Sequence, residues 1–181
     1  MNSTQIREYL KNGELKTPAY VFDMDVLAEH VKKMQEIVGN DIGLCYAMKA
    51  NPFLVPAMAQ LVDKIEVCSP GELSICQEYG IPGHKIIFSG VNKACQDVET
   101  ALSYGVAVIT VESEKHFRLI CDYCKRHNTT ADVLFRITNG SQFGMNVEDI
   151  EAILSHREQY AYIHVKGIHY FSGTQKKKPD K

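Results

Sequence analysis

The chain has 181 residues, of which 45% are hydrophobic and 23% charged, and its formal net charge at pH 7 is -2. Such values are typical of a soluble globular domain, and the near-neutral charge gives no reason to expect a nucleic acid partner. No apolar run approaches the roughly 18 residues of a membrane span, and the polar first residues do not resemble a signal peptide. We therefore expect a cytoplasmic protein without a membrane partner.

Two helices are expected first. A short helix within residues 1–16 ends at Asn12-Gly13, since glycine commonly follows the last helical residue. Asp23 or Asp25 can cap a second helix, whose apolar side chains recur every three or four residues until Gly39. We treat residues 1–16 as a segment that precedes the main domain.

From residue 42 onward one unit recurs, a short apolar strand followed by an amphipathic helix. The strands are expected at residues 42–47, 65–68, 85–88, 106–111, 131–137 and 162–170. The helices between them are expected at residues 53–63, 71–79, 94–104, 113–127 and 147–157. Several strands are apolar throughout, which predicts burial on both faces, as in a parallel sheet with crossover helices.

Two architectures fit this alternation. A doubly wound open sheet usually carries a glycine-rich turn after its first strand, whereas residues 48–52 contain no glycine. A (β/α)8 barrel of the TIM type needs eight units in roughly 250 residues. An unclosed sheet would leave two unpaired edges. We therefore predict that residues 17–181 form an α/β barrel domain that is truncated after about six strands. We also predict that the chain is a fragment of a longer protein.

The cysteines raise the question of a disulfide or metal site. Four stand singly among apolar neighbours, which favours reduced thiols in the core: Cys45, Cys68, Cys76 and Cys95. Cys121 and Cys124 form a C-x-x-C, but no second pair accompanies them and their segment has the pattern of a helix. We expect no bound metal.

Lys49 is the candidate for chemistry. It lies where Asn51-Pro52 stops the first strand, and ligands of parallel α/β sheets bind at the carboxyl ends of the strands. A lysine that acts as a nucleophile must lose its proton, which low dielectric and neighbouring cations favour. The alternative for this segment is a simple strand end without a catalytic role.

Other polar side chains are expected at the same rim. Arg136 stands isolated in an apolar strand, where it can either supply a cation or neutralise Glu66 or Glu72 inside the barrel. His169 and Phe171 are two residues apart on the last strand, so they share one face and suit a planar ligand. A core histidine is the alternative for His169.

Three further segments are expected at the rim, and two of them have a structural interpretation. Ser172-Gly173-Thr174 offers hydroxyls and a close backbone to an anion such as phosphate. Ser69-Pro70-Gly71-Glu72 is expected to cap the helix that follows. Glu112 is a rim residue or simply an acidic charge in the first turn of a helix.

Six motifs in order across residues 17–175 resemble the fold-type III, pyridoxal-phosphate-dependent amino-acid decarboxylases, the ornithine/diaminopimelate/arginine decarboxylase group. The motifs are Tyr46–Pro52, Glu66–Leu73, Phe88–Lys93, Leu134–Ile137, Phe143-Gly144 and Gly167–Gln175. The resemblance implies an alanine racemase-like barrel and pyridoxal 5'-phosphate as the cofactor. It also implies a homodimeric parent protein with a C-terminal β-domain that this chain does not contain.

The resemblance further implies roles for single residues. Lys49 would bind the cofactor covalently, and Glu66 stands where the family usually has an aspartate. Arg136 matches the family's arginine on the fifth strand, and Thr174 a serine that touches the phosphate. A histidine that stacks on the pyridine ring in the family is replaced by Phe171. The residues expected to bind the cofactor are therefore Lys49, Glu66, Arg136, His169, Phe171 and Thr174.

The function predicted from the resemblance is pyridoxal-phosphate-dependent decarboxylation of an amino acid by the parent protein. Its small-molecule substrate resembles diaminopimelate or ornithine. A phenylalanine at position 171 is instead similar to a subgroup that acts on carrier-protein-bound amino acids or siderophore precursors. The chain alone is expected to be inactive, because the family's glycine-rich phosphate loop, acidic partner of the pyridine nitrogen and catalytic cysteine lie downstream. Two alternatives remain open, a racemase of the same fold and a non-catalytic binding or regulatory module.

Overall fold

The computed structural model of the chain describes residues 3–13 and 16–174. The chain divides between Leu44 and Cys45 into two compact units, which are described separately. The end of the Gly167–Gln175 motif and the lysine-rich stretch after it lie outside the described residues.

The first unit contains two helices, α1 at Ser3–Lys11 and α2 at Met24–Val38. The carboxylate of Asp23 accepts a hydrogen bond from the Val26 N–H at 3.2 Å and so caps α2. Gly39, with φ of +80°, follows the last turn of α2. The predicted start and end of this helix are therefore confirmed, with Asp23 rather than Asp25 as the cap.

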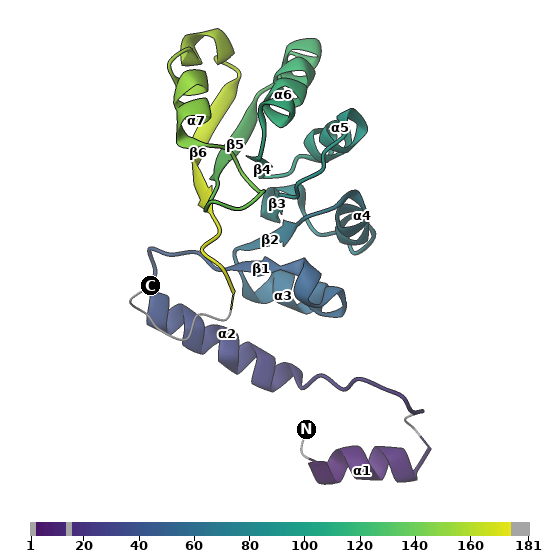
Figure 1. Cartoon of the computed structure of the whole chain (residues 1–181). Helices are drawn as coiled ribbons and strands as arrows, with labels where there is room; N and C mark the ends of the chain where they lie inside the picture. The colour runs from purple at the N-terminus through teal and green to yellow at the C-terminus, as the bar shows by residue number, and fades with distance from the viewer. Residues whose placement is uncertain (1–2, 14–15, 175–181) are drawn as a thin grey trace. The chain divides into compact units, whose positions relative to one another are not determined.

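The second unit is a parallel sheet of six strands that lie side by side in the order of the sequence (Figure 1). The strands are β1 Cys45–Ala47, β2 Lys64–Val67, β3 Ile86–Phe88, β4 Val108–Val111, β5 Ala131–Ile137 and β6 Ile163–Tyr170. A doubly wound sheet reverses its strand order, whereas a (β/α) barrel does not. The predicted barrel type is confirmed, and the described sheet does not close.

A helix follows each of the first five strands. These helices are α3 Val55–Leu61, α4 Pro70–Glu78, α5 Cys95–Tyr104, α6 Glu114–His127 and α7 Val147–Leu154. Figure 1 shows α3 to α6 along the outer side of the arc of strands. Within the described ranges of the chain, no helix has the length and apolar character needed to cross a membrane.

The core lies between the strands and the helices. Alternate strand residues are buried there, among them Ile65, Val67, Ile86, Phe88, Ile109, Val111, Val133 and Phe135. Some residues between them, such as Glu66 and Leu134, are only partly buried and line the inner side of the arc, whereas Thr110 of β4 is fully buried. The expected burial on both faces therefore holds for β4 but not for β2 or β5. Because the described sheet does not close, its inner face is only partly covered, and edge strand β1 is partly exposed.

Strand β6 contains a bulge that changes which of its residues face inward. Val133 of β5 pairs with Val165, but the next residue, Leu134, pairs with Gly167, so Lys166 is an extra residue. Because side chains alternate along a strand, one inserted residue exchanges the two faces of everything that follows. His169 consequently pairs with Arg136 and shares its inward face.

The cysteines differ in burial. Cys76, Cys121 and Cys124 are buried and Cys68 is partly buried, but Cys45 and Cys95 are exposed, which contradicts the expectation of core thiols. Cys45 belongs to the edge strand β1 and Cys95 is the first residue of α5, so neither lies beneath a second layer. The C-x-x-C lies inside α6, as its helical pattern predicted.

Candidate active site

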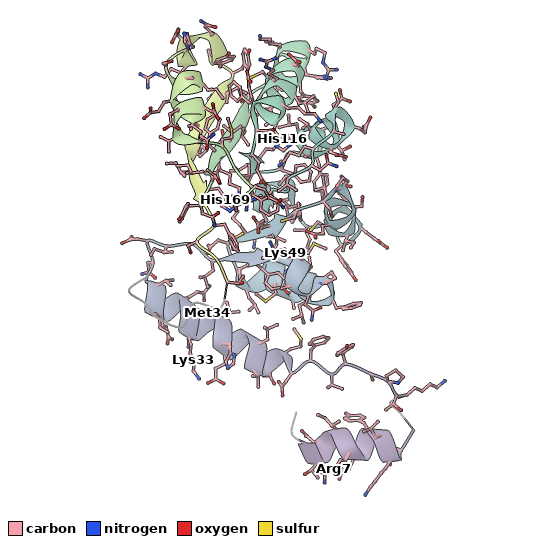
Figure 2. All side chains as sticks on the ribbon, viewed as in Figure 1. Arg7, Lys33, Met34, Lys49, His116 and His169 are labelled. Carbon is pink, nitrogen blue, oxygen red and sulfur yellow. The ribbon has the colours of Figure 1, made fainter. Side chains whose placement is uncertain are left out.

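One pocket, with a volume of about 580 Å³, contains all of the side chains expected to bind a cofactor. Its lining consists of Ala47, Lys49, Glu66, Cys68, Ser89, Gly90, Val91, Glu112, Arg136, Phe143, His169, Phe171 and Thr174. These residues come from all six strands or from the segments that directly follow them. Parallel strands bring their carboxyl ends to one rim, which explains this convergence. Figure 2 labels Lys49 and His169, which stand at the first and last strands.

Lys49 lies in a single 3-10 turn, Met48–Ala50, directly after β1. Met48 before it is fully buried, whereas Lys49 is exposed and lines the pocket. The Tyr46 hydroxyl donates to the Asn51 carbonyl at 2.9 Å, and the Asn51 side chain accepts from the Phe53 N–H at 3.1 Å. The turn that presents the Lys49 amine is therefore anchored on both sides.

Arg136 is held from two sides. Its Nη1 donates to Oε2 of Glu112 at 2.5 Å, and its guanidinium lies 5.3 Å from the ring centroid of Phe143. Thr110 of β4 pairs with Leu134 of β5, so the residues two positions later, Glu112 and Arg136, stand beside each other. The expected alternative that Arg136 neutralises Glu66 or Glu72 is wrong, because Arg136 pairs with Glu112 of the neighbouring segment instead.

The segment after β2 forms a complete helix cap. Ser69 Oγ accepts from the Glu72 N–H at 3.2 Å, while Oε2 of Glu72 accepts from the Cys68 N–H at 2.7 Å. Ser69 is thus the N-cap predicted for α4, and Glu72 reaches back to the N–H of the residue before that cap. It leaves the backbone at Cys68 fixed at the edge of the pocket.

Glu112 is a buried carboxylate rather than an exposed charge in a first helical turn. Only 6% of Glu112 is exposed, and its second oxygen, Oε1, has no hydrogen-bond partner among the described residues. The Glu112 N–H donates to Nδ1 of buried His116 at 3.4 Å. Burial lowers the pKa of His116 to about 4, so the ring is neutral near pH 7 and its proton is on Nε2.

Lys93 is entirely buried next to the pocket. Its ammonium donates to the Gly90 carbonyl at 2.5 Å and lies 5.6 Å from the centroid of the Phe88 ring. Gly90 has φ of +101°, and a Cβ there would overlap the Cys68 carbonyl oxygen. The wall formed by Ser89, Gly90 and Val91 is therefore packed directly against the segment after β2.

His169 is partly buried, and its Nδ1 has no hydrogen-bond partner within the part of the chain that the structure describes. Burial lowers the pKa of His169 below its ordinary value. The bulge in β6 places it beside Arg136. Phe171, two residues later, also lines the pocket, so the predicted common face of the two rings is confirmed.

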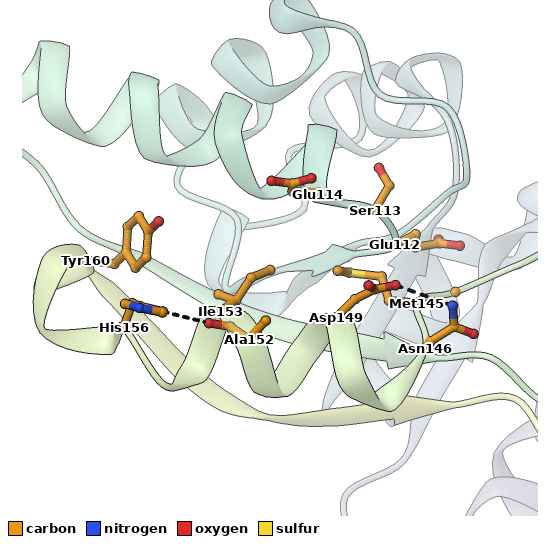
Figure 3. Close-up of a pocket in the computed structure, with 11 residues that line it drawn as sticks. Glu112, Ser113, Glu114, Met145, Asn146, Asp149, Ala152, Ile153, His156 and Tyr160 are labelled. Atoms are coloured by element: carbon orange, nitrogen blue, oxygen red, sulfur yellow. Dashed lines mark hydrogen bonds between the residues drawn. The ribbon is translucent and has the colours of Figure 1, made fainter.

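A second pocket of about 580 Å³ lies beside the first, between α6 and α7 (Figure 3). Glu112 borders both pockets, and the second one also contains the carboxylates of Glu114 and Asp149. Neither Lys49 nor Arg136 reaches it. Because the second pocket contains no nucleophilic amine among its described lining residues, we assign the candidate chemistry to the first.

From the sequence alone, Lys93 had no predicted role, and Glu112 was not identified as the partner of Arg136. Both follow strands of the predicted barrel, so their position at the rim was a usable signal. Their burial was not visible in the sequence, because it depends on the packing of α5 and α6 against neighbouring segments. The roles of the pocket residues toward a cofactor remain predictions.

Curated proteins with similar sequences are decarboxylases. The chain is 29% identical to a diaminopimelate decarboxylase of Halalkalibacterium halodurans, covering 88% of this chain and 41% of that protein. It is 28% identical to an L-glutamyl-[BtrI acyl-carrier protein] decarboxylase of Niallia circulans, covering 97% of this chain and 45% of that protein. The chain thus spans less than half the length of these relatives.

A solved structure agrees in fold. The lysine decarboxylase of Selenomonas ruminantium superposes with a TM-score of 0.76 at 26% identity, covering 97% of this chain and 47% of that one. The family described as pyridoxal-dependent decarboxylase, pyridoxal binding domain, has a sequence model that matches residues 24–180. The match includes every strand of the described sheet and every residue expected in the pocket, it lies in the family's pyridoxal-binding domain, and the chain therefore belongs to the pyridoxal-dependent decarboxylase family.

Proposed function

We propose that Lys49 is the covalent attachment point of pyridoxal 5'-phosphate, and that the whole protein decarboxylates an amino acid. The observation that supports this most directly is the pocket itself. Lys49, Arg136 and His169 are far apart in the sequence, yet all three line one cavity at the carboxyl ends of parallel strands. The pocket thus combines an accessible amine, a fixed cation and an aromatic ring.

The lining fits the cofactor in shape and chemistry. His169 and Phe171 offer ring faces on one side of β6, where a flat pyridine ring can stack. Nδ1 of His169 is buried without a hydrogen-bond partner among the described residues, so it is available to a polar group of a bound molecule. The Thr174 hydroxyl, also in the lining, suits a phosphate oxygen.

Bound pyridoxal phosphate supplies a ring that accepts the electron pair left when a carboxylate is lost as carbon dioxide. The residues of this chain bind and orient. Lys49 would hold the cofactor through its side-chain amine. Arg136, kept in place by Glu112 and Phe143, directs its charge toward anionic or electron-rich groups in the pocket. Phe171 would shield a bound ring from water without offering it a hydrogen bond.

Two substrate classes follow from the relatives. The H. halodurans protein is named for diaminopimelate, and a free diamino acid is the first candidate. The N. circulans protein is named for a glutamyl group on an acyl-carrier protein, and its match covers 97% of this chain. Together with Phe171, it supports a carrier-bound amino acid as the second candidate. The proposal includes a cytoplasmic homodimer as the complete protein.

The test of cofactor attachment uses the full-length protein. The protein is mixed with pyridoxal 5'-phosphate, reduced with borohydride and digested, and the modified lysine is located by peptide mass spectrometry. We expect a pyridoxyl group on Lys49 and none on the Lys49→Ala variant. A Lys64→Met variant, which removes a lysine bonded to the His84 carbonyl on another segment, should be labelled like wild type. A pyridoxyl group found on other lysines but not on Lys49 would refute the proposal.

The reaction is tested on the full-length protein. Release of carbon dioxide from carboxyl-labelled amino acids, offered free or as carrier-protein thioesters, supports decarboxylation and distinguishes the two substrate classes. Inversion of the substrate without release of carbon dioxide would instead identify a racemase of the same fold. Cofactor attachment without turnover of either kind would identify a binding or regulatory module.

A further inference from the structure

A completely buried lysine next to the pocket has no role in the proposed chemistry. Lys93 is 0% exposed, and its ammonium donates to the Gly90 carbonyl. Removing an ammonium from water costs free energy unless the group is paired with an opposite charge and hydrogen-bonded. Lysines elsewhere in the sheet meet carbonyls without full burial, as Lys85 does at the opposite end of β3. The burial of Lys93 therefore needs a specific explanation.

The surroundings of Lys93 connect it to the pocket in two ways. Its hydrogen bond fixes Gly90, which lines the pocket between Ser89 and Val91. Its charge acts on Glu112, the carboxylate that holds Arg136. Because Oε1 of Glu112 has no hydrogen-bond partner among the described residues, this carboxylate is free to respond to a second cation besides Arg136.

We propose that Lys93 is a positioning residue of the Lys49 pocket: it fixes the Gly90 wall and, through Glu112, sets how much of the Arg136 charge is available to an anionic ligand. With a protonated Lys93, a second positive charge acts on Glu112 besides that of Arg136, and Arg136 can attract a phosphate or carboxylate. With a neutral Lys93, Glu112 neutralises Arg136 alone. The proposal rests on the proposed function only for the identity of the ligand.

The charge of Lys93 changes in an accessible pH range. Burial lowers its pKa from 10.5 to about 8. The charged and titratable groups that act on it come from every neighbouring segment: Glu112 after β4, Cys68 after β2, Arg136 on β5, Asp97 on α5 and, in turn, His116 on α6. Glu112 raises the pKa of Lys93 and Arg136 lowers it. The loss of the Lys93 proton therefore changes the net charge around the Glu112–Arg136 pair.

The first experiment needs no cofactor. The side-chain 15Nε signal of Arg136, assigned by comparison with an Arg136→Gln sample, is followed by NMR between pH 6.5 and 9.5. We expect a step with a midpoint near pH 8 in wild type. The step should be absent in Lys93→Met, which keeps the length of the side chain without its charge, and present in Lys85→Met. A flat wild-type profile, or an equal step in Lys93→Met, would overturn the proposal.

The second experiment uses the full-length protein, with pyridoxal 5'-phosphate as the probe at pH 7. Loss of a charge-assisted contact and of the fixed wall should weaken binding about tenfold in Lys93→Met, while Lys85→Met stays within about twofold of wild type. In Lys93→Arg, which is permanently charged, affinity should no longer fall above pH 8 as it does in wild type. Unchanged binding by Lys93→Met would overturn the proposal. If wild type itself does not bind, the proposed function fails, and the NMR titration still decides the role of Lys93.

Discussion

Nη1 of Arg136 and Oε2 of Glu112 lie 2.5 Å apart, with only 14% and 3% of their side chains exposed. The two residues belong to neighbouring parallel segments, so the pair joins the wall after β4 to the centre of the pocket. Ion pairs at the surface contribute little, but a buried pair that loses one member leaves an uncompensated charge. The stability of this chain and the geometry of its pocket therefore depend on the same contact.

Replacing Glu112 by glutamine should destabilise the chain by about 3 kcal/mol, because Arg136 keeps its charge without a counter-ion. Urea unfolding followed by circular dichroism measures the change. Glu114→Gln is the matched control, since Glu114 pairs with Arg118 at the surface, and the loss of that pair should cost less than about 1 kcal/mol. Equal effects of the two variants would show that the buried pair has no special weight.

The neutral state of His116 predicts a loss of stability in acid. The pKa of His116 is about 4 in the folded chain against 6.5 for an ordinary histidine. Between these values the unfolded chain binds a proton that the folded chain does not, so stability falls as the pH drops from 6.5 to 4. In His116→Gln this part of the pH dependence should disappear. The free energy of unfolding of both proteins, measured at several pH values in this window, provides the comparison, and parallel profiles would contradict the assignment.

Gly90 should not tolerate any side chain. A Cβ would overlap the Cys68 carbonyl oxygen, at φ of +101°, so Gly90→Ala forces β2 and β3 apart at the pocket. We expect a loss of more than about 3 kcal/mol, in the range of severe packing defects. Gly105→Ala is the control: Gly105 also has positive φ, +76°, but nothing lies within 4 Å of the position that its Cβ would take. Its cost should be about 1 kcal/mol, as thermal unfolding can show.

The bulge at Lys166 can be tested by deletion. Without Lys166, Gly167 would follow Val165 directly, so β6 would pair continuously with β5 and His169 would still stand opposite Arg136. Pyridoxal phosphate binding should therefore stay close to that of wild type. Lys166→Ala removes only the exposed ion pair with Asp132 and keeps the register, so it should bind like wild type as well. A crystal structure of the deletion variant with His169 turned out of the pocket would contradict this explanation.

Much of the fold follows from patterns that are local in sequence. The alternation of strands and helices, the cap formed by Asp23 and the cap formed by Ser69 each depend on a few neighbouring residues, and each was predictable. The convergence of Lys49 and Arg136 was predictable as well, because parallel strands end at one rim.

What the sequence did not reveal depends on register and on packing between segments. Whether Arg136 meets Glu66 or Glu112 is decided by which strand lies next to β5 and by how the two strands are aligned. The bulge at Lys166 has no local signature other than the glycine that follows it. The burial of Lys93 results from helices and loops that meet from distant parts of the chain.

The sequential order of strands in the described sheet also has a consequence for how the chain folds. Each strand pairs only with the strand before or after it, so contacting partners are separated by one strand-and-helix unit. Each pairing therefore closes only one strand-and-helix unit, and the entropic cost of closure rises with the length of chain that is closed. The sheet can therefore grow strand by strand from β1 while the polypeptide leaves the ribosome.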